Sequence, residues 1–327
     1  MTVPDLLAEL TKLGEVARTR TLFRRGFSDT TIRGAVDSGT VSRPRRGWIV
    51  SSTADRDQLR AIAVGGRIGC LSALGRFGVW SGVDDDLHLQ VPRTASRIDP
   101  LAAGVGVTTK NQGVWHPSVP ERRRRSRSIR LATGTAVDVH WGLELAPDSV
   151  LDWIVSPQTA LAAALRCMDA EHAAAAIDSV LHERVLTRRA VDAVLASLPG
   201  TCRTLVDQFT GVPESGVESL FIRRASDAGF VVEPQVDLAG FGRYDGLIDG
   251  CVLFEIDGRG YHSSSDEFFT DRDRSLIGQA FGIPVIRPSA RHVLDDWPMV
   301  LAVVERVVAD AKILRRVRGL PPIATRR

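Results

Sequence analysis

The stretch VVEPQVDLAGFGRYDGLIDGCVLFEID, residues 231–257, decides the fold expected for the last part of the chain. Its apolar and β-branched residues fall into three short runs, and such runs between turn residues are typical of strands. We predict strands at 231–238, 243–248 and 252–256, joined by glycine-containing turns at 240–242 and 249–250. Such short turns make consecutive strands neighbours in one sheet.

Helical patterns flank these strands. Residues 214–229 carry apolar side chains at helical spacing, and a polar helix is expected at 266–281. A buried strand at 283–287 and a last helix at 293–308 complete an αβββαβα order. We therefore expect a domain at 201–310 and assign the whole chain to the mixed α/β (α+β) class.

Acidic residues interrupt the apolar strands of this domain. Glu255 and Asp257 are two positions apart, so along a strand they point to the same face, and Asp245 on the neighbouring strand can reach that side. Hard oxygen ligands of this kind suit Mg²⁺ or Mn²⁺, which can activate a water for attack on a phosphodiester. Burying such charges without a cation is costly, which favours a metal site. The alternative is a structural ion-pair network with Arg243, Arg259 or Arg272.

The composition is that of an ordinary globular protein. The chain has 327 residues and a mass of 35.5 kDa, and 44% of its residues are hydrophobic and 25% charged. This length predicts roughly two domains, and the balance excludes a disordered, collagen-like or coiled-coil protein. The sequence contains no run of about 18 apolar residues, and its N-terminus lacks the pattern of a secretory signal. We therefore expect a cytoplasmic protein without a membrane partner.

The cysteines and histidines lie far apart in the sequence. Cys70, Cys167, Cys202 and Cys251 form no CxxC pair, so we expect reduced, mostly buried thiols rather than a zinc site. The same argument treats the scattered histidines of the middle region as structural or surface residues. These are His88, His116, His140, His172 and His182.

The net charge of +3 hides an uneven distribution. Residues 1–60 contain 11 basic and 7 acidic residues, whereas residues 201–327 contain 16 and 18. In the middle region, six arginines cluster after two prolines, at Arg122, Arg123, Arg124, Arg125, Arg127 and Arg130. Such a run is typical of a solvated loop, and beside another basic element it is a candidate DNA-binding site.

The first 55 residues are expected to form a winged helix-turn-helix. Helices are predicted at 5–13, 15–24 and 29–38, and TVSRPRRGWIV (40–50) predicts a hairpin with arginines at its turn. The third helix then offers side chains to the major groove, and the hairpin offers cations to phosphates. The residues in these roles are Thr30, Thr31, Arg33, Arg43, Arg45 and Arg46.

The segments GFSDTTIRGAVDSGTVSRPRRGWIV (26–50) and LRAIAVGGRIGCLSALGRFGVW (59–80) resemble the N-terminal domain of the AbiEi family of antitoxins from type IV toxin–antitoxin systems. The resemblance covers residues 5 to about 90. It implies a DNA-binding regulator that represses its own operon and has a cognate toxin as partner. The alternative for residues 1–55 is a small helical bundle that packs against the rest of the chain and contacts no nucleic acid.

Between residues 56 and 200 we expect a mixed α/β middle domain. Helices are predicted there at 57–64, 72–77, 156–170, 171–186 and 187–198. Strands are predicted at 87–91, 105–109 and 137–141. A basic tail at 311–327, which would add weak phosphate affinity, follows the last domain.

Three motifs of the last domain resemble the PD-(D/E)XK nuclease superfamily, and within it the very-short-patch-repair-like endonuclease domains. They are RYDGLID (243–249), FEIDGRGYH (254–262) and FFTDRDRSLIGQAFGIPVIR (268–287). The resemblance implies a restriction-endonuclease-like fold in which Asp245 and Glu255 are the first and second metal carboxylates. The further site residues that it implies are Asp257, the helix glutamate Glu218, His262 near the scissile phosphate, and Arg272 facing the site or the DNA backbone.

One position departs from the pattern of the superfamily. A lysine often follows the second acid by two residues and stabilises developing phosphate charge, and here Asp257 stands in its place. His262 or Arg272 could supply the missing positive charge. The leading hypothesis is a Mg²⁺- or Mn²⁺-dependent endonuclease acting on duplex DNA, with RNA left open as a substrate. The alternative is a non-enzymatic, AbiEi-like autoregulator with an inactive nuclease fold.

Overall fold

The computed structural model describes residues 1–84, 86–93, 95, 126–130, 136–142, 151–200, 209–238, 242–257, 282–321 and 323. These residues form helices and three small β-sheets, which confirms the expected mixed α/β class. The chain divides into two compact units. Unit 1 comprises Met1–Ala176 and Glu183–Asp207, and unit 2 comprises Ile177–His182 and Gln208–Arg327. Among the described helices, none combines the length and apolar character needed to cross a lipid bilayer.

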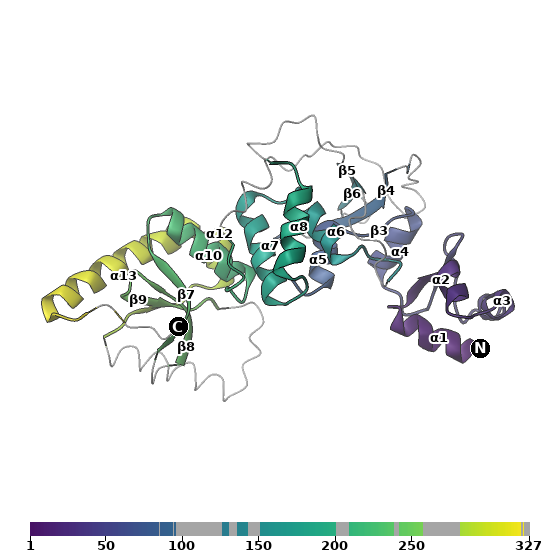
Figure 1. The fold of residues 1–327 in the computed structure, drawn as a ribbon, viewed down its shortest axis with the longest axis horizontal. Helices are drawn as coiled ribbons and strands as arrows, with labels where there is room; N and C mark the ends of the chain where they lie inside the picture. The colour runs from purple at the N-terminus through teal and green to yellow at the C-terminus, as the bar shows by residue number, and fades with distance from the viewer. Residues whose placement is uncertain are drawn as a thin grey trace. The chain divides into compact units, whose positions relative to one another are not determined.

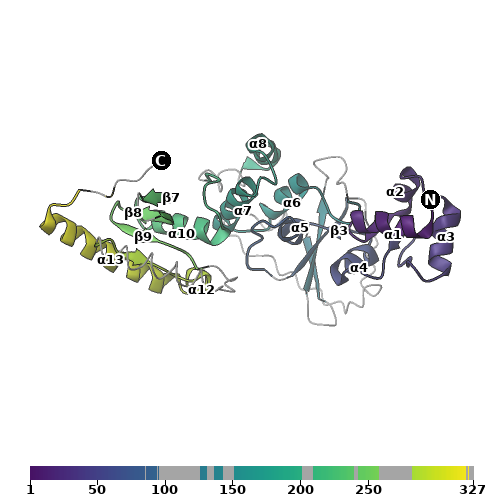
Figure 2. The ribbon, with the colours of Figure 1, turned by 90° about the horizontal axis from the view of Figure 1, so that it is seen from below.

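The N-terminal part of unit 1 joins three helices to a two-stranded sheet (Figure 2). Its elements are α1 (Val3–Lys12), β1 (Val16–Arg18), α2 (Thr19–Arg24), α3 (Asp29–Asp37) and β2 (Trp48–Val50). β1 and β2 pair antiparallel, and Ser42 forms a further antiparallel bridge with Val50, so the chain turns back between Ser42 and β2. The buried side chains of Leu10, Leu22 and Ile32 bring the three helices together in one core.

The predicted helix at 15–24 begins later than expected. Gly14 and Glu15 both have a φ of +72°, a left-handed conformation that ends the preceding helix and reverses the chain. The next three residues form β1, in which Val16 and Ala17 are buried. The helix α2 starts only at Thr19. The prediction was wrong because a buried strand of three residues and the start of a helix have the same apolar pattern.

A four-stranded sheet and several helices form the rest of unit 1 (Figure 1). The sheet order is β3-β4-β6-β5, with β4 and β6 parallel and the other pairs antiparallel. The helix α5 packs against β4 and α6, and α8 packs against α6. The elements are α4 (Arg56–Ala63), β3 (Arg67–Ile68), α5 (Cys70–Arg76), β4 (Leu87–Pro92), β5 (Ser126–Arg130), β6 (Ala136–Gly142), α6 (Pro157–Ala164) and α8 (Arg188–Ser197). A further helix, α7 (Ala170–His182), begins in unit 1 and ends in unit 2.

Two expectations for the middle region change. Residues 126–130, which continue the arginine run, form the edge strand β5 rather than a loop, because they pair with β6. Charged residues are common on edge strands, so the arginines there do not oppose strand formation. The helix predicted at 156–170 ends at Ala164, which places Cys167 in the turn that follows. The predicted strand at 105–109 lies outside the described residues.

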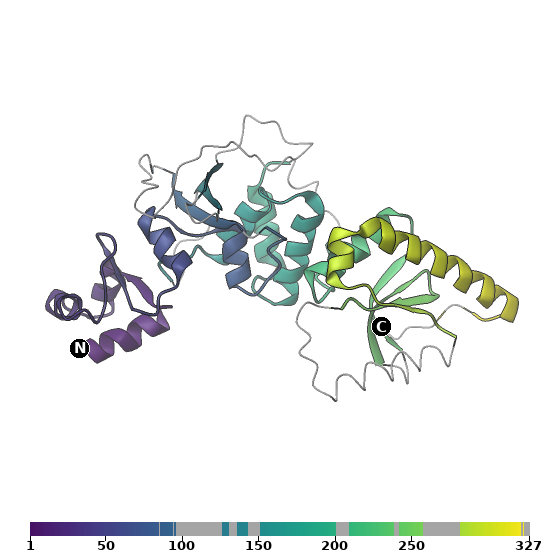
Figure 3. The ribbon, with the colours of Figure 1, turned by 180° about the vertical axis from the view of Figure 1, so that it is seen from behind.

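Unit 2 contains a four-stranded sheet, with α10 packed against β7 and α13 against β9 (Figure 3). Strands β7, β8 and β9 are antiparallel neighbours, and β10 pairs parallel with β9, which gives the order β10-β9-β8-β7. The ring centroids of Phe221 and Phe254 are 4.5 Å apart, and this contact joins α10 to the sheet. The elements are α10 (Gly216–Asp227), β7 (Val232–Leu238), β8 (Gly242–Ile248), β9 (Val252–Phe254), β10 (Val285–Ile286), α12 (Ala290–Asp295) and α13 (Trp297–Arg318).

The strand predictions for this unit are confirmed within a few residues. The last helix differs from the prediction. The helix expected at 293–308 is divided into α12 and α13, because Asp296 ends the first and caps the second. The Asp296 side chain accepts a hydrogen bond of 3.4 Å from the backbone N–H of Met299, and Pro298 occupies the first turn. The polar helix predicted at 266–281 lies outside the described residues.

We expect Gly246→Ala to destabilise unit 2. A Cβ atom at Gly246 would lie 2.5 Å from the carbonyl oxygen of Glu233 on β7 and against the ring of Phe254 on β9, the two strands that flank β8. Overpacking of this kind costs about 1–3 kcal/mol, which urea unfolding would measure. The control is Gly34→Ala on α3, where the new Cβ would have no neighbour within 4 Å. Equal stability of Gly246→Ala and the wild type would contradict this packing.

Candidate functional site

Asp245 lies on β8 and is tied to the end of β9. Its Oδ2 accepts a hydrogen bond of 2.7 Å from the backbone N–H of Ile256. The two strands pair antiparallel through Gly246 and Phe254, which brings the segments side by side. The Asp245 carboxylate is therefore held against the backbone between Glu255 and Asp257.

Glu255 and Asp257 follow β9 directly and continue its extended path. The backbone N–H of Glu255 donates a 3.0 Å hydrogen bond to the carbonyl of Ile286. That of Asp257 donates a 3.1 Å bond to Pro288, and a parallel bridge joins Asp257 to Ser289. Alternate residues that face the same neighbouring strand also share a face of the sheet. The backbone thus agrees with the expectation that Glu255 and Asp257 project together.

Glu255 forms an ion pair with Arg287, and the two side chains are only 13% and 20% exposed. Arg287 follows β10, the parallel neighbour of β9, so the pairing of these strands brings the two residues together. Removing one partner of a largely buried pair leaves the other charge poorly solvated. Arg287 therefore supplies a positive charge inside the site, whereas the side chain of Asp257 is exposed.

The helix α10 contributes Glu218, whose side chain is 6% exposed. Its Oε2 accepts hydrogen bonds of 3.0 Å from the backbone N–H of Glu214 and 2.9 Å from Nε2 of Gln235. Burial, followed by the charge of Asp245, raises the pKa of Glu218 to about 7, against the effect of the bonds from Glu214 and Ser215. A carboxyl group of this kind can take up or release a proton near neutral pH.

Gln235 is a site residue that sequence reasoning missed. It has a φ of +51°, in the left-handed region that residues other than glycine rarely adopt. The β7–β8 ladder pairs Pro234 with Gly246 and Val236 with Tyr244, and it is interrupted between these pairs, opposite Asp245. Backbone strain at such positions often accompanies function. Here it accompanies the hydrogen bond from Gln235 to Glu218, and no sequence pattern indicates it.

Glu218, Asp245, Glu255 and Asp257, which we call the carboxylate cluster, offer hard oxygen ligands at one part of unit 2. Two other groups in the described chain have three or more potential ligand atoms within 4.8 Å of one another, and the carboxylate cluster is not among them. Mg²⁺ needs no such close set, because it keeps several waters and binds one or two carboxylates. The oxygen chemistry and the excess of acidic groups over Arg287 therefore fit a hard divalent cation.

Some of the predicted DNA-contacting residues are exposed as expected. On α3, Thr30 and Arg33 are exposed, and Arg33 forms an ion pair with Asp29 one turn earlier. Between Ser42 and β2, Arg43 and Arg46 are exposed. These four side chains lie on the elements that the winged-helix interpretation assigns to the major groove and to phosphates.

Two other predicted DNA contacts have partners within the protein. The hydroxyl of Thr31 lies 2.9 Å from that of Ser28, which caps α3, and donates a 3.2 Å bond to the carbonyl of Met1. Nη1 of Arg45 donates a 2.5 Å hydrogen bond to the carbonyl of Ala63 at the end of α4. Thr31 and Arg45 therefore have structural contacts that DNA binding would have to keep or replace.

Several predicted site residues lie outside the described residues. They are His262, Arg272, Arg122, Arg123, Arg124 and Arg125. Their roles remain predictions.

A second polar cluster was missed entirely. Cys70, His88, His140 and Cys167, which we call the Cys₂His₂ cluster, have their potential ligand atoms within 4.8 Å of one another, although their sequence positions do not have the spacing of a metal-binding motif. The pKa of Cys167 is lowered, and the largest cause is its side-chain hydrogen bond with Cys70. Burial opposes the charged form of His88, but Asp84 and Cys167 together raise its pKa to about 10. The signal that could have revealed the cluster is the period-two alternation LHLQV and VDVHW, which places polar residues on one face of two buried strands.

Comparison of the chain with protein-family models finds no match, and a search of curated proteins finds none either.

We expect Glu218→Gln to remove a pH dependence of stability. Because the folded-state pKa of about 7 lies above the ordinary value of 4.5, the folded chain binds this proton more tightly than the unfolded chain. Without a divalent ion, stability therefore falls as pH rises from about 4.5 to about 7, and it stays lower at higher pH. Each pKa unit corresponds to about 1.4 kcal/mol, so ionisation costs up to about 3 kcal/mol.

Urea unfolding in EDTA across this pH range measures the effect. Glutamine keeps an oxygen that can accept the bonds from Glu214 and Gln235, so Glu218→Gln tests the charge rather than the contacts. Asp237→Asn, at an exposed position of β7, is the control and should keep the wild-type profile. Parallel profiles for the wild type and Glu218→Gln would show that Glu218 ionises without cost.

Proposed function

We propose that this protein is a metal-dependent DNA endonuclease whose catalytic centre is the carboxylate cluster of unit 2. The observation that carries the proposal is the 2.7 Å hydrogen bond from Ile256 to Asp245. It holds an acidic side chain of β8 at the extended segment that bears Glu255 and Asp257. Asp245 thus lies beside the segment that bears Glu255 and Asp257, which supports the carboxylate site that the resemblance to PD-(D/E)XK nucleases implies.

The topology of unit 2 supports the same proposal. A helix bearing a buried glutamate precedes three antiparallel strands, and a fourth strand pairs parallel with the third. This order agrees with the restriction-endonuclease-like fold implied by the motifs RYDGLID and FEIDGRGYH. Glu218 lies on the helix, Asp245 on the second strand, and Glu255 and Asp257 directly after the third, an order that supports the roles implied by the resemblance.

In this proposal Asp245 and Glu255 hold Mg²⁺ or Mn²⁺, and Asp257 adds a further acidic group. When bound, the ion would polarise a phosphate oxygen and lower the pKa of a water. Glu218 would accept a proton at its carboxylate, and its hydrogen bonds to Glu214 and Gln235 orient it for this role. Glu218 then acts as a general base close to neutral pH.

In this proposal Arg287 supplies the positive charge that is missing because Asp257 stands in place of the superfamily's lysine. The superfamily's lysine stabilises developing phosphate charge, and Asp257 cannot do this. The guanidinium of Arg287 lies beside Glu255 in the structure. In the proposed reaction Glu255 would hold the ion, and the guanidinium of Arg287 would then be available to interact with a phosphate oxygen.

The N-terminal part of unit 1 would hold the DNA. Its order of helix, strand, two helices and a turn closed by β2 supports the winged helix-turn-helix interpretation, in which the third helix enters the major groove. Thr30 and Arg33 on α3 are exposed for base or phosphate contacts. Arg43 and Arg46 precede β2 and are suited to phosphate contacts along one edge of the groove.

A non-enzymatic, AbiEi-like DNA-binding regulator is the second candidate. The observation that favours it is the ion pair between Glu255 and Arg287, which neutralises a proposed metal ligand without any ion. In this case unit 2 is an inactive nuclease fold, and the winged helix alone accounts for the function. Cleavage separates the two candidates, whereas DNA binding is common to both.

We expect Asp245→Asn to abolish cleavage of duplex DNA. The substitution removes a negative charge but keeps an oxygen that can accept the bond from Ile256. Cleavage of plasmid DNA with Mg²⁺ or Mn²⁺ should fall about 100-fold or more, because even outer partners of metal ligands contribute about 10-fold to 100-fold. Asp237→Asn, an exposed acid on β7, should cleave at the wild-type rate.

Two outcomes contradict the endonuclease. One is wild-type protein, shown to be folded, that cleaves neither duplex nor single-stranded DNA with either ion. The other is equal cleavage by the wild type and Asp245→Asn, which would assign the activity to a contaminant or to another site. In the first case, specific binding of DNA by the same preparation would support the regulator.

We expect the double variant Arg43→Ala with Arg46→Ala to bind duplex DNA more weakly. Each lost phosphate contact should lower the slope of log affinity against log salt by about 1, so the double variant loses about 2. Fluorescence anisotropy with a labelled duplex at several salt concentrations measures both quantities. Arg291→Ala with Arg306→Ala, at exposed positions of α12 and α13, is the control. An unchanged slope in the double variant would exclude the proposed phosphate contacts.

A further inference from the structure

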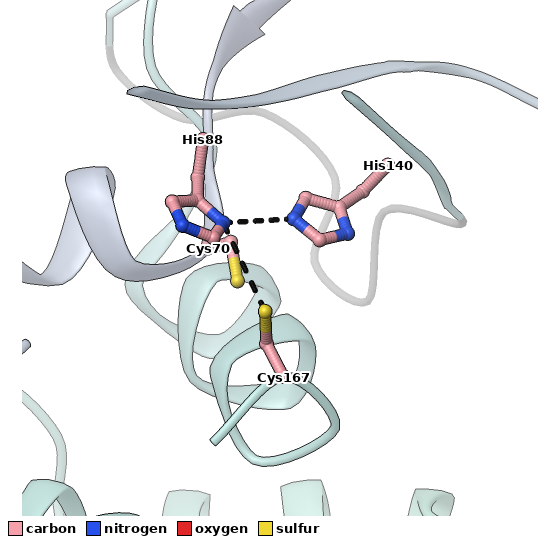
Figure 4. Close-up of side chains that lie close together, drawn as sticks. All are labelled: Cys70, His88, His140 and Cys167. Carbon is pink, nitrogen blue, oxygen red and sulfur yellow. Dashed lines mark hydrogen bonds between the residues drawn. The ribbon is translucent and has the colours of Figure 1, made fainter. Parts of the chain in front are cut away.

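The Cys₂His₂ cluster of unit 1 has the composition of a metal centre (Figure 4). Nδ1 of His88 lies 3.0 Å from Nε2 of His140 and 3.9 Å from Sγ of Cys167. Bonds of about 2.0 Å to nitrogen and 2.3 Å to sulfur in a tetrahedron place two nitrogens about 3.3 Å apart and a nitrogen and a sulfur about 3.5 Å apart. The observed separations lie close to these values, so one ion fits among the four side chains with small adjustments.

Four elements of the fold deliver the four side chains. Cys70 begins α5, and Cys167 lies in the turn after α6, the helix that packs against α5. His88 is on β4 and His140 on β6, which are parallel neighbours. In their register His88 pairs with Asp138, so His140, two residues further, lies on the same face as His88. The sheet thus presents two imidazoles to one thiol at the start of α5 and one in the turn after α6.

The cluster is buried, which makes its polarity informative. The side chains of Cys70 and His88 are fully buried, and those of Cys167 and His140 are half-buried. Buried histidine and cysteine pairs require compensation, because isolated thiolates and imidazolium ions are costly to remove from water. A divalent ion with two thiolates and two neutral imidazoles has no net charge, so it removes that cost.

Asp84 provides an outer partner for one of the histidines. Its Oδ2 lies 3.4 Å from Nε2 of His88, the ring nitrogen that does not face the cluster. A proton on Nε2 directed at this carboxylate leaves a lone pair on Nδ1, which faces His140 and Cys167. Histidines that bind metals almost always make such a contact through their second nitrogen, and it fixes the tautomer. The contact therefore points to a ligand independently of the clustering.

Hydrogen bonds of the backbone also hold together the segments that carry the Cys₂His₂ cluster, independently of any ion. The N–H of Gly69 donates a 3.0 Å hydrogen bond to the carbonyl of His88, and the N–H of His88 donates a 2.8 Å bond to Oγ of Ser72. These bonds fix the start of α5 against β4. The positions of Cys70 and His88 are therefore set by the fold, so the site is formed before an ion arrives.

We propose that Cys70, His88, His140 and Cys167 bind a structural Zn²⁺ ion. Tetrahedral sites with two sulfur and two nitrogen ligands are typical of zinc, and a full set of four protein ligands leaves no open position for substrate. The proposal is independent of the endonuclease, because the ligands lie in unit 1 and the carboxylate cluster lies in unit 2.

The role of the ion would be to hold the middle region of unit 1 together. The two histidines are 52 residues apart, and Cys167 is 79 residues from His88. A clip between such distant positions restricts long loops in the unfolded chain, where the loss of entropy is large. Zinc would thereby join α5, β4, β6 and the turn after α6, elements that otherwise meet only through packing and hydrogen bonds.

Metal analysis of the full-length protein, with any affinity tag removed, tests the proposal. We expect one zinc per chain after purification under reducing conditions. The zinc-free protein should take up Co²⁺ and show thiolate charge-transfer absorption together with the strong visible bands of tetrahedral cobalt. Removing zinc with a strong chelator should lower the thermal midpoint, and added Zn²⁺, but not Mg²⁺, should restore it. These measurements use the wild-type chain, so they do not depend on any variant folding.

Variants then assign the ligands. Cys167→Ser, at a half-buried position, should retain less than about a tenth of the wild-type zinc, because a structural site depends on its full ligand set. Cys251→Ser, at the buried cysteine of unit 2, should keep all of it. His172→Gln should also keep it, and this control excludes the more exposed group of Asp169, Glu171 and His172.

Three results would overturn the proposal. The first is a wild-type chain that binds neither Zn²⁺ nor Co²⁺ under reducing conditions. The second is a cobalt complex with the weak bands of octahedral geometry and no thiolate absorption. The third is full zinc content in Cys167→Ser, or its loss in His172→Gln, either of which would place the ion elsewhere.

Discussion

The hydrogen bond from the backbone of Ile256 to the Asp245 carboxylate is the contact on which the proposed centre of unit 2 depends. It links β8 to the segment after β9, and the sheet beneath it sets its geometry. Gly246 has no side chain, so the ring of Phe254 can lie against β8. Phe254 in turn packs against Phe221 of α10, the helix that carries Glu218. This aromatic pair thus holds the helix that bears Glu218 against the sheet that bears Asp245.

Both units contain buried groups that would be costly without a partner. In unit 2, burial and the charge of Asp245 raise the pKa of Glu218 to about 7. The charge of Glu255 is compensated by its ion pair with Arg287. In unit 1, two thiols and two imidazoles meet between a sheet and two helices. Apolar side chains of similar volume would cost less free energy to bury in either unit. The retained polarity therefore favours functional ligands, hard and oxygen-based in one unit and soft in the other.

Local sequence patterns predicted the order of elements in unit 2, because each strand there is short, apolar and bounded by turn residues such as those at 249–250. They also placed Asp245 and Glu255 correctly on or beside adjacent strands. They failed at β1, where three buried residues resemble the start of a helix. The left-handed backbone conformation of Gln235 could not be predicted either, because it depends on contacts rather than on residue type.

The Cys₂His₂ cluster and the Glu255–Arg287 pair could not be predicted for a different reason. Both depend on the pairing of parallel strands, β4 with β6 and β9 with β10, whose register is set by tertiary packing and not by a short turn. Spacing rules for zinc ligands detect local loops, and here the two histidines are 52 residues apart. The alternating polar residues of β4 and β6 were the available signal.

Anomalous scattering from crystals grown with Mn²⁺ would show whether the carboxylate cluster binds a divalent ion. We predict a manganese peak bound by Asp245 and Glu255, with Arg287 displaced from Glu255. A structure at saturating Mn²⁺ in which the peak is absent and the Glu255–Arg287 ion pair persists would contradict it.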